Sequence, residues 1–401
     1  MFNIIRSLTN DKDFVLNNLP IISTGVIPLF KYMENIKKID FDEDLIQIMS
    51  NIINHLQCIP DMGYELLINL YKYPEKNGGM LLDVYELVNA YIVYGGKTIE
   101  QNQQYLKAMI DIFTVSINAT KFTKSPFYIC VLIQIWLMNS KTVPTEVVTH
   151  FVDTCIDKLN TLHTSIEKEK ENYVDVSCNY MAYLVLLYVS CINYAPICLG
   201  ELNKVNKMAD LINWTNTIFN FDFVSSYQIK ILVLSISNLI NSNYFQKDCE
   251  VFLGFGFKLL EKQRKNESVE LKKLLKKEIN CNFITDSDDE NDDEDNNSDE
   301  DDYDGLLGFD NKKELQDLIK HTINPMKEQD EFVIYKSAIE NFKQNNSDGF
   351  QKWSQSLSSA DRTKLTDIIE MKRITIKDRD LEYSIPRKIV KIKRRNNQPS
   401  Q

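Results

Sequence analysis

Apolar residues recur every three or four positions from about residue 40 to about residue 265, and this spacing predicts a succession of amphipathic helices. Each series places its apolar side chains on one face of a helix, where they can pack against a neighbour. The clearest series are Leu106, Met109, Ile110, Phe113 and Ile117; Val148, Phe151, Val152, Cys155 and Leu159; and Met181, Leu184, Val185, Tyr188 and Ile192.

Two stretches, 180–192 and 229–240, are apolar on nearly every face. Helices of this kind need neighbours on several sides, as they have in a stack. The stretch 180–192 is shorter than the roughly 20 residues that cross a bilayer, so we expect no membrane insertion.

Local signals indicate where several helices begin and end. Gly95-Gly96 is expected to end one helix, and Thr98 with Gln101 matches a capping box that would begin the next. Pro144 suits the first turn of a further helix, because its missing N–H costs no hydrogen bond there.

The expected helices pair into hairpins, and the spacing of these pairs predicts the fold class. It favours an all-α fold, a HEAT- or armadillo-like helical-repeat solenoid, although no repeated sequence signature accompanies it. A compact multi-helix bundle is the alternative. The hairpins are expected at about 40–74, 78–119, 122–163, 172–220 and 223–264.

The composition agrees with long helices and a reducing compartment. Only 12 Gly and 10 Pro occur in 401 residues, which leaves few turn signals. None of the eight cysteines forms a CxxC pair, and most lie in apolar helical patterns, so we expect reduced core cysteines. The N-terminal residues contain no secretory signal, which favours an intracellular protein.

The most informative segment is the acidic run, which we define as residues 286–304. It carries 13 acidic residues in 19 positions and no basic one. The whole chain has a formal charge of −11, whereas the chain without these 13 carries 46 basic and 44 acidic residues, or +2. A block of like charge this dense is expected to stay solvated and to favour a basic partner.

The acidic residues of the run are the candidate contacts for that basic partner. They are Asp286, Asp288, Asp289, Glu290, Asp292, Asp293, Glu294, Asp295, Asp299, Glu300, Asp301, Asp302 and Asp304. The alternative interpretation is a solubilising linker without a partner.

Beyond the run, the pattern predicts a short helix near 311–321 and longer ones near 328–344 and 359–373. Residues 372–395 then hold ten basic residues against three acidic ones. This basic tail has three open interpretations: autoinhibition by folding onto the acidic run, RNA binding or a localisation signal, and an inert tail. The expected organisation is a helical solenoid at 1–285, an acidic disordered loop at 286–305, a C-terminal helical module at 306–376 and a basic disordered tail at 377–401.

Candidate catalytic chemistry is sparse in this sequence. The histidines are scattered, and none has a Ser, Cys or Asp partner at a motif spacing. His55 and Cys58 make only half of a metal site, and Gly254-Phe255-Gly256 lacks the third glycine of a dinucleotide loop. We therefore expect no enzyme, no metal and no cofactor. The histidines are His55, His150, His163 and His321.

The order of segments at the C-terminal end resembles that of a known family. After the acidic run come Asp330–Ile339 (DEFVIYKSAI), Trp353–Leu357 (WSQSL), and a helix that opens with Ala360-Asp361-Arg362 and continues through Leu365 and Ile368. This order resembles the C-terminal end of the importin-beta (karyopherin) family, in its importin seven/eight class.

Upstream, residues 175–264 are similar to the last repeats before that class's own acidic segment. Ile212-Asn213-Trp214 and Phe252–Lys258 (FLGFGFK) carry this similarity, and residues 40–165 are compatible with it. The resemblance covers most of the chain and is specific in its order of repeats, acidic loop and aromatic-bearing helical module.

The resemblance implies a nuclear import receptor built as a stack of HEAT repeats. Such a receptor carries basic protein cargo such as ribosomal proteins or histones, contacts Phe-Gly nucleoporins, and releases cargo when Ran-GTP binds. It implies shuttling between cytoplasm and nucleus, with no direct contact to nucleic acid expected. The competing interpretation is a Ran-independent helical scaffold or acidic chaperone for basic proteins.

Overall fold

The computed structural model describes residues 7–33, 42–73, 82–118, 125–140, 143–166, 173–221, 224–241, 248–283, 326 and 329–370. These residues are helical apart from short connections and contain no β-strand, so the fold class is all-α. The chain divides into two compact units, Met1–Glu328 and Gln329–Gln401.

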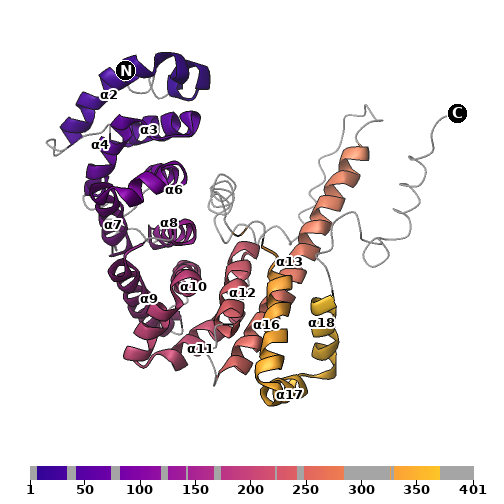
Figure 1. Ribbon diagram of the computed structural model, residues 1–401. Coiled ribbons are helices and arrows are strands. Elements are labelled where there is room, and N and C mark those ends of the chain that lie inside the picture. Colours follow the sequence, from indigo (N-terminus) through magenta and orange to yellow (C-terminus); the bar gives the residue numbers. More distant parts are fainter. Residues whose placement is uncertain are drawn as a thin grey trace. The chain divides into compact units, whose positions relative to one another are not determined.

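The first unit consists of helices that follow one another with short connections (Figure 1). They are α2 (Lys12–Met33), α3 (Asp42–Leu56), α4 (Asp61–Leu70), α6 (Leu82–Gln101), α7 (Gln103–Asn118), α8 (Ser125–Asn139), α9 (Thr145–Ile166), α10 (Tyr173–Lys204), α11 (Met208–Thr217), the 3-10 turn η1 (Ile218–Asn220), α12 (Ser226–Asn241) and α13 (Cys249–Phe283).

Helices of this unit pack both on the next helix in the chain, as α9 does on α10 and α12 on α13, and on helices two or three places away. One row of successive contacts runs through α3, α6, α8, α10 and α12, while α4 packs on α7 and α11 on α13. Figure 1 shows α3, α6 and α8 one below another, with α4, α7 and α9 in a second row to their left. Each hairpin range expected from residue 40 onward contains two helices, namely α3 and α4, α6 and α7, α8 and α9, α10 and α11, and α12 and α13. Within these pairs, α6 packs on α7, α10 on α11 and α12 on α13.

The two stretches that are apolar on nearly every face lie in the core, as predicted. Residues 180–191 of α10 are all buried, because α10 contacts α8, α9, α11 and α12. In α12 every residue from 229 to 240 except Asn238 is buried. These two helices therefore bury apolar surface in several directions at once.

The expectation that the apolar stretch 180–192 is too short to cross a membrane needs correction. The apolar run 180–192 is part of a longer helix, and its segment Val176–Lys204 is long and apolar enough to cross a membrane. However, 72% of its most apolar window is buried inside the unit, and core helices pass the same test of length and composition.

The expected helix boundary at Gly95-Gly96 is wrong. Helix α6 continues through both glycines to Gln101, and Thr98 lies in its last turn. The next helix is capped by Asn102, whose Oδ1 accepts hydrogen bonds from the backbone N–H of Gln104 at 2.9 Å and of Tyr105 at 3.3 Å. Pro144 likewise lies one residue before α9, and its carbonyl accepts from the N–H of Val147 and Val148.

Gly95 has a packing role instead of a terminating one. A Cβ at this position would come within 2.2 Å of the Ile59 Cδ1, whereas a Cβ on Gly96 would meet nothing within 4 Å. The missing side chain of Gly95 thus allows the segment before α4 to approach α6 closely.

Two helices were not predicted from the sequence, and a third is longer than predicted. Helix α2 precedes the region of clear periodicity, and α13 extends to Phe283 instead of ending near residue 264. Helix α17 (Ser347–Ser356) begins in a polar sequence that is typical of a loop. It forms because the Asn346 side chain accepts a hydrogen bond from the N–H of Gly349 at 2.9 Å and so caps the helix.

The second unit packs α17 and α18 (Ser359–Glu370) against α16 (Glu331–Asn345). Asp330 caps α16 by accepting from the N–H of Phe332 and Val333. The core of this unit contains Phe332, Tyr335, Ile339, Phe342, Trp353, Leu365 and Ile368. Helices α16 and α18 agree with the predicted ones, while the predicted helix at 311–321 lies outside the described residues.

Candidate functional site

The acidic run lies outside the described residues, as does the basic tail. None of the 13 predicted contact residues, from Asp286 to Asp304, therefore has a described position. The structure describes instead the helix that leads toward the run, since α13 ends at Phe283.

Polar and basic side chains in the first half of α13 contact the segment that joins α11 to α12. The Lys262 Nζ donates a hydrogen bond to the Phe221 carbonyl, and the Asn266 Nδ2 donates to the Val224 carbonyl at 3.2 Å. The Lys258 Nζ lies 5.2 Å from the centre of the Phe219 ring, within the range of a cation–π contact. These contacts hold the start of α13 against the segment between α11 and α12.

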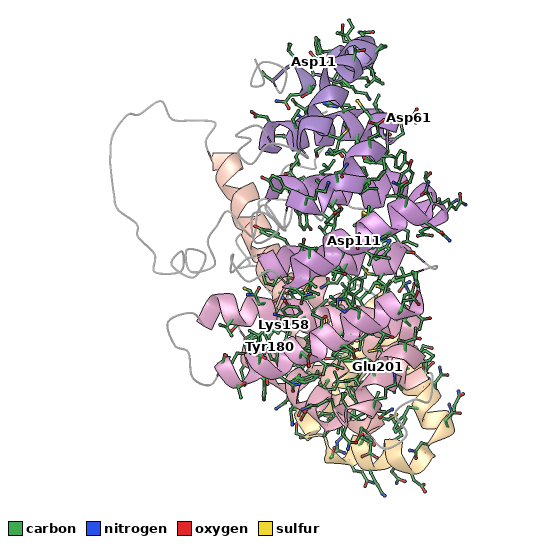
Figure 2. The ribbon with its side chains drawn as sticks, turned by 90° about the vertical axis from the view of Figure 1, so that its left-hand side faces the viewer. Asp11, Asp61, Asp111, Lys158, Tyr180 and Glu201 are labelled. Carbon is green, nitrogen blue, oxygen red and sulfur yellow. The ribbon has the colours of Figure 1, made fainter. Side chains whose placement is uncertain are left out.

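A second group of acidic side chains, which we call the α9–α10 acidic group, consists of Asp153, Asp157 and Glu201. The Lys204 Nζ pairs with the Glu201 Oε1 at 2.6 Å, and Lys158 lies beside Asp157 in sequence (Glu201 and Lys158 are labelled in Figure 2). Partial burial raises the pKa of Asp153, and the charges of Glu201 and Asp157 raise it further. Lys204 and His150 act in the opposite direction and lower this pKa, so the surroundings of Asp153 carry charges of both signs.

His163 contacts hydroxyl groups of two neighbouring helices. The His163 Nδ1 lies 3.4 Å from the Tyr180 hydroxyl and 3.5 Å from the Thr217 hydroxyl, and Tyr180 donates to the Trp214 carbonyl at 3.1 Å. Among the residues that the structure describes, no three His, Cys, Asp or Glu side chains are close enough to hold a metal ion. His321 is not among the described residues.

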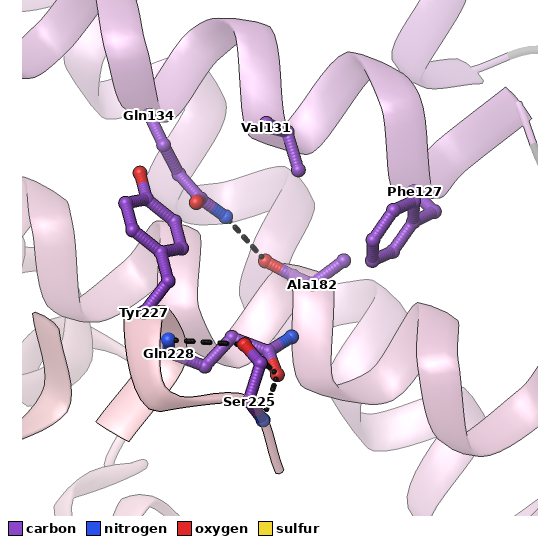
Figure 3. A pocket seen from close by; sticks show the side chains of 7 residues that line it. All are labelled: Phe127, Val131, Gln134, Ala182, Ser225, Tyr227 and Gln228. Atoms are coloured by element: carbon purple, nitrogen blue, oxygen red, sulfur yellow. Dashed lines mark hydrogen bonds between the residues drawn. The ribbon is translucent and has the colours of Figure 1, made fainter. Parts of the chain in front are cut away.

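A small cavity lies between α8, α10 and the beginning of α12 (Figure 3). It has room for about one water molecule, so it cannot hold a cofactor or metabolite. The Gln134 Nε2 crosses it to donate to the Ala182 carbonyl at 3.2 Å. The residues that line it are Phe127, Val131, Gln134, Ala182, Ser225, Tyr227 and Gln228.

The same cavity wall contains a capping box that the sequence reading missed. The Ser225 Oγ accepts from the Gln228 N–H at 3.3 Å, while the Gln228 Oε1 accepts from the Ser225 N–H at 3.0 Å. These reciprocal bonds begin α12 (Figure 3). The signature Ser-x-x-Gln could have been found in the sequence, but the equally good match at Thr98 would have competed with it.

The cysteines are mostly buried, as predicted. Cys130, Cys155, Cys191, Cys198 and Cys249 are buried, and burial raises the pKa of Cys249 to about 11. One arrangement was not foreseen from spacing: the Sγ atoms of Cys191 and Cys198 lie 2.9 Å apart. Their spacing of seven residues matches no common cysteine motif, so the sequence carries no signal for this contact.

Two of the described cysteines are exceptions to this burial, because Cys58 is exposed just after α3 and Cys178 is partly exposed. The side chain of Cys281 is not described.

No protein-family model, no curated protein and no solved structure matches this chain. Its function must therefore be argued from its charge distribution and its helical architecture.

Proposed function

We propose that this chain is a nuclear import receptor, or the cargo-binding part of one, that carries basic proteins such as ribosomal proteins or histones. The observation that carries the proposal is the acidic run, which contains 13 acidic residues in 19 positions and accounts for more than the net negative charge of the chain. Under this proposal the chain is a member of the importin-beta family. Ran-GTP releases its cargo, and Phe-Gly nucleoporins are its partners during transport.

The helix contacts of the first unit support a repeat architecture. In a solenoid, each helical hairpin packs on the hairpins before and after it, which produces contacts between helices two places apart. The contacts of α3 with α6, α6 with α8, α8 with α10, and α10 with α12 have this form. We infer that these hairpins are HEAT-like repeats, which offer an extended surface to a protein partner instead of a pocket.

The acidic run would act by raising the local concentration of negative charge beside that surface. A Lys- or Arg-rich cargo would be attracted quickly, and its affinity would fall with salt because the Debye length is only about 8 Å at physiological ionic strength.

The test replaces the 13 acidic residues of the run by Asn and Gln in the full chain and titrates it with a purified histone heterodimer. We expect the affinity at low salt to fall by at least about tenfold, and its salt dependence to become shallower. The control is a variant with the residues of 286–304 in scrambled order, which keeps the charge and should keep the affinity. Equal affinity of the neutralised and unmodified chains at low salt would favour the linker interpretation and contradict the proposal.

The second candidate function is a Ran-independent scaffold or acidic chaperone for basic proteins, which the same acidic run supports. Calorimetric titration of the full chain with Ran loaded with GTP, and in parallel with GDP, separates the two. Binding of the GTP form alone, with loss of bound histone, supports the import receptor. Binding of neither form, with histone affinity intact, supports the chaperone.

A further inference from the structure

Helix α10 contains a bend whose cause is visible in its sequence. Tyr194 has φ −131° and ψ 35°, which is not helical, and Pro196 follows two residues later. Proline has no N–H, and its ring clashes with the carbonyl four residues earlier, here that of Ile192. The helix therefore bends at this point and continues in a new direction to Lys204.

The groups freed by the bend are satisfied by neighbouring helices. The Asn238 Nδ2 of α12 donates to the Ile192 carbonyl at 3.0 Å. In the other direction, the Asn193 Nδ2 donates to the Leu137 carbonyl at 2.8 Å, and the Tyr194 hydroxyl donates to the Ser140 carbonyl at 3.2 Å. The bend thus connects α10 to the end of α8 and to α12.

Cys191 and Cys198 lie on opposite sides of this bend. In a straight helix, residues seven apart are separated by about 10.5 Å along the axis at ~1.5 Å per residue, too far for a disulfide. Here their Sγ atoms are 2.9 Å apart, and both side chains are almost completely buried. The contact between the two thiols therefore depends on the bend.

We propose that Cys191 and Cys198 form a modification site, a dithiol that converts reversibly to an intrachain disulfide and then staples α10 in its bent form. The oxidant is a small disulfide. The thiolate of one cysteine attacks the small disulfide, forms a mixed disulfide with half of it and releases the other half as a thiol. The thiolate of the second cysteine then attacks the mixed disulfide at the protein sulfur and releases the remaining half as a second thiol. Two protons and two electrons pass from the protein to the small disulfide, which becomes two thiols.

The surroundings of the pair predict a slow reaction. Contact with the Cys191 thiol and burial raise the pKa of Cys198 well above its ordinary value, so little thiolate is present near neutral pH. A small disulfide also reaches the pair only when α10 opens locally. We expect the reaction to take minutes to hours and to accelerate as the pH rises.

The experiment uses the full chain with Cys58, Cys178 and Cys281 replaced by Ser, because the Cys58 thiol is exposed, the Cys178 thiol is partly exposed and the Cys281 side chain is not described. The protein is incubated with 2-hydroxyethyl disulfide at pH 7.5 and at pH 9, quenched in acid, unfolded and alkylated, and its mass is measured. We expect loss of two alkylatable thiols without a retained adduct, a peptide that joins Cys191 to Cys198, and full recovery with dithiothreitol.

Two variants make the test specific. Cys198→Ala should abolish the disulfide, whereas Cys249→Ala, which removes another buried thiol, should leave it intact. Oxidation should also slow hydrogen exchange in α10 on the order of tenfold, and this change should be absent in Cys198→Ala. Complete retention of all thiols at both pH values, or a disulfide that does not include this pair, would overturn the proposal.

Discussion

The Tyr85 hydroxyl is completely buried in α6, and no hydrogen-bond partner reaches it among the described residues. Burial raises the pKa of Tyr85 well above its ordinary value, so the hydroxyl is neutral near physiological pH. The nearby Tyr91 of the same helix differs, because its hydroxyl donates to the Gly63 carbonyl at 2.5 Å. These two tyrosines form a matched pair for measuring the cost of an unsatisfied hydroxyl.

We predict that Tyr85→Phe leaves the free energy of unfolding unchanged or raises it by up to about 1 kcal/mol, because an unsatisfied polar group is removed. Tyr91→Phe should lower it by about 1–2 kcal/mol, because the Gly63 carbonyl loses its donor. Urea denaturation followed by circular dichroism measures both values. Equal destabilisation by the two substitutions would mean that Tyr85 has a water-mediated partner.

At the scale of elements, the end of α6 is decided by packing and not by the glycines within it. Gly95 faces Ile59 closely, while Gly96 faces open space. We predict that Gly95→Ala lowers the free energy of unfolding by about 1–3 kcal/mol through overpacking, whereas Gly96→Ala raises it by about 0.5–1 kcal/mol through lower chain entropy. Thermal denaturation of the two variants provides the comparison.

A third variant identifies the clash as the cause. Ile59→Val removes the Cδ1 atom that a Cβ on Gly95 would meet at 2.2 Å. It should therefore recover part of the stability lost in Gly95→Ala, although it costs stability alone. Purely additive effects would show that Gly95 matters for another reason.

The bend in α10 predicts that substitutions in α10 and in α12 have coupled effects on stability. Asn238→Ala removes the donor to the Ile192 carbonyl and should cost about 1–3 kcal/mol. Pro196→Ala restores a backbone N–H that can bond the same carbonyl, so the cost of Asn238→Ala should be smaller in that background. A double-mutant cycle by urea denaturation measures the coupling, which we expect to exceed about 0.5 kcal/mol. No coupling would mean that the Ile192 carbonyl stays with Asn238 alone.

At the scale of the whole molecule, the chain comprises two compact units, each with its own apolar core. Trp353 is buried in the second unit, and Trp214 is buried in the first. We predict that Trp353→Ala costs about 3–5 kcal/mol and that its faster hydrogen exchange is confined to α16, α17 and α18. Trp214→Ala should accelerate exchange in α10 and α13 instead, since α11 contacts both. Faster exchange across all helices in either variant would contradict separate cores.

Much of the fold could be predicted because helical periodicity is a local property. The stripes at 148–159 and 181–188 are buried as expected, since an apolar face needs a neighbour whatever that neighbour is. The Thr98 and Ser225 signatures look alike in sequence, yet only Ser225 begins a helix. The difference between the two is visible only in the structure, where Thr98 lies within the last turn of α6.

The two candidate sites, the acidic run and the pair of Cys191 and Cys198, differ in how far the sequence alone reveals them. The acidic run was found from sequence alone, because charge density is additive along the chain and needs no fold to be counted. The thiol pair could not be found, because residues seven apart meet only when a helix bends. Pro196 made a bend possible, but the side chains of α8, α10 and α12 determined its direction and hence brought the two sulfur atoms together. Sequence by itself therefore determined the all-α class and the charge distribution, and tertiary structure decided the helix ends, the bend and the thiol contact, because these depend on atoms distant along the chain.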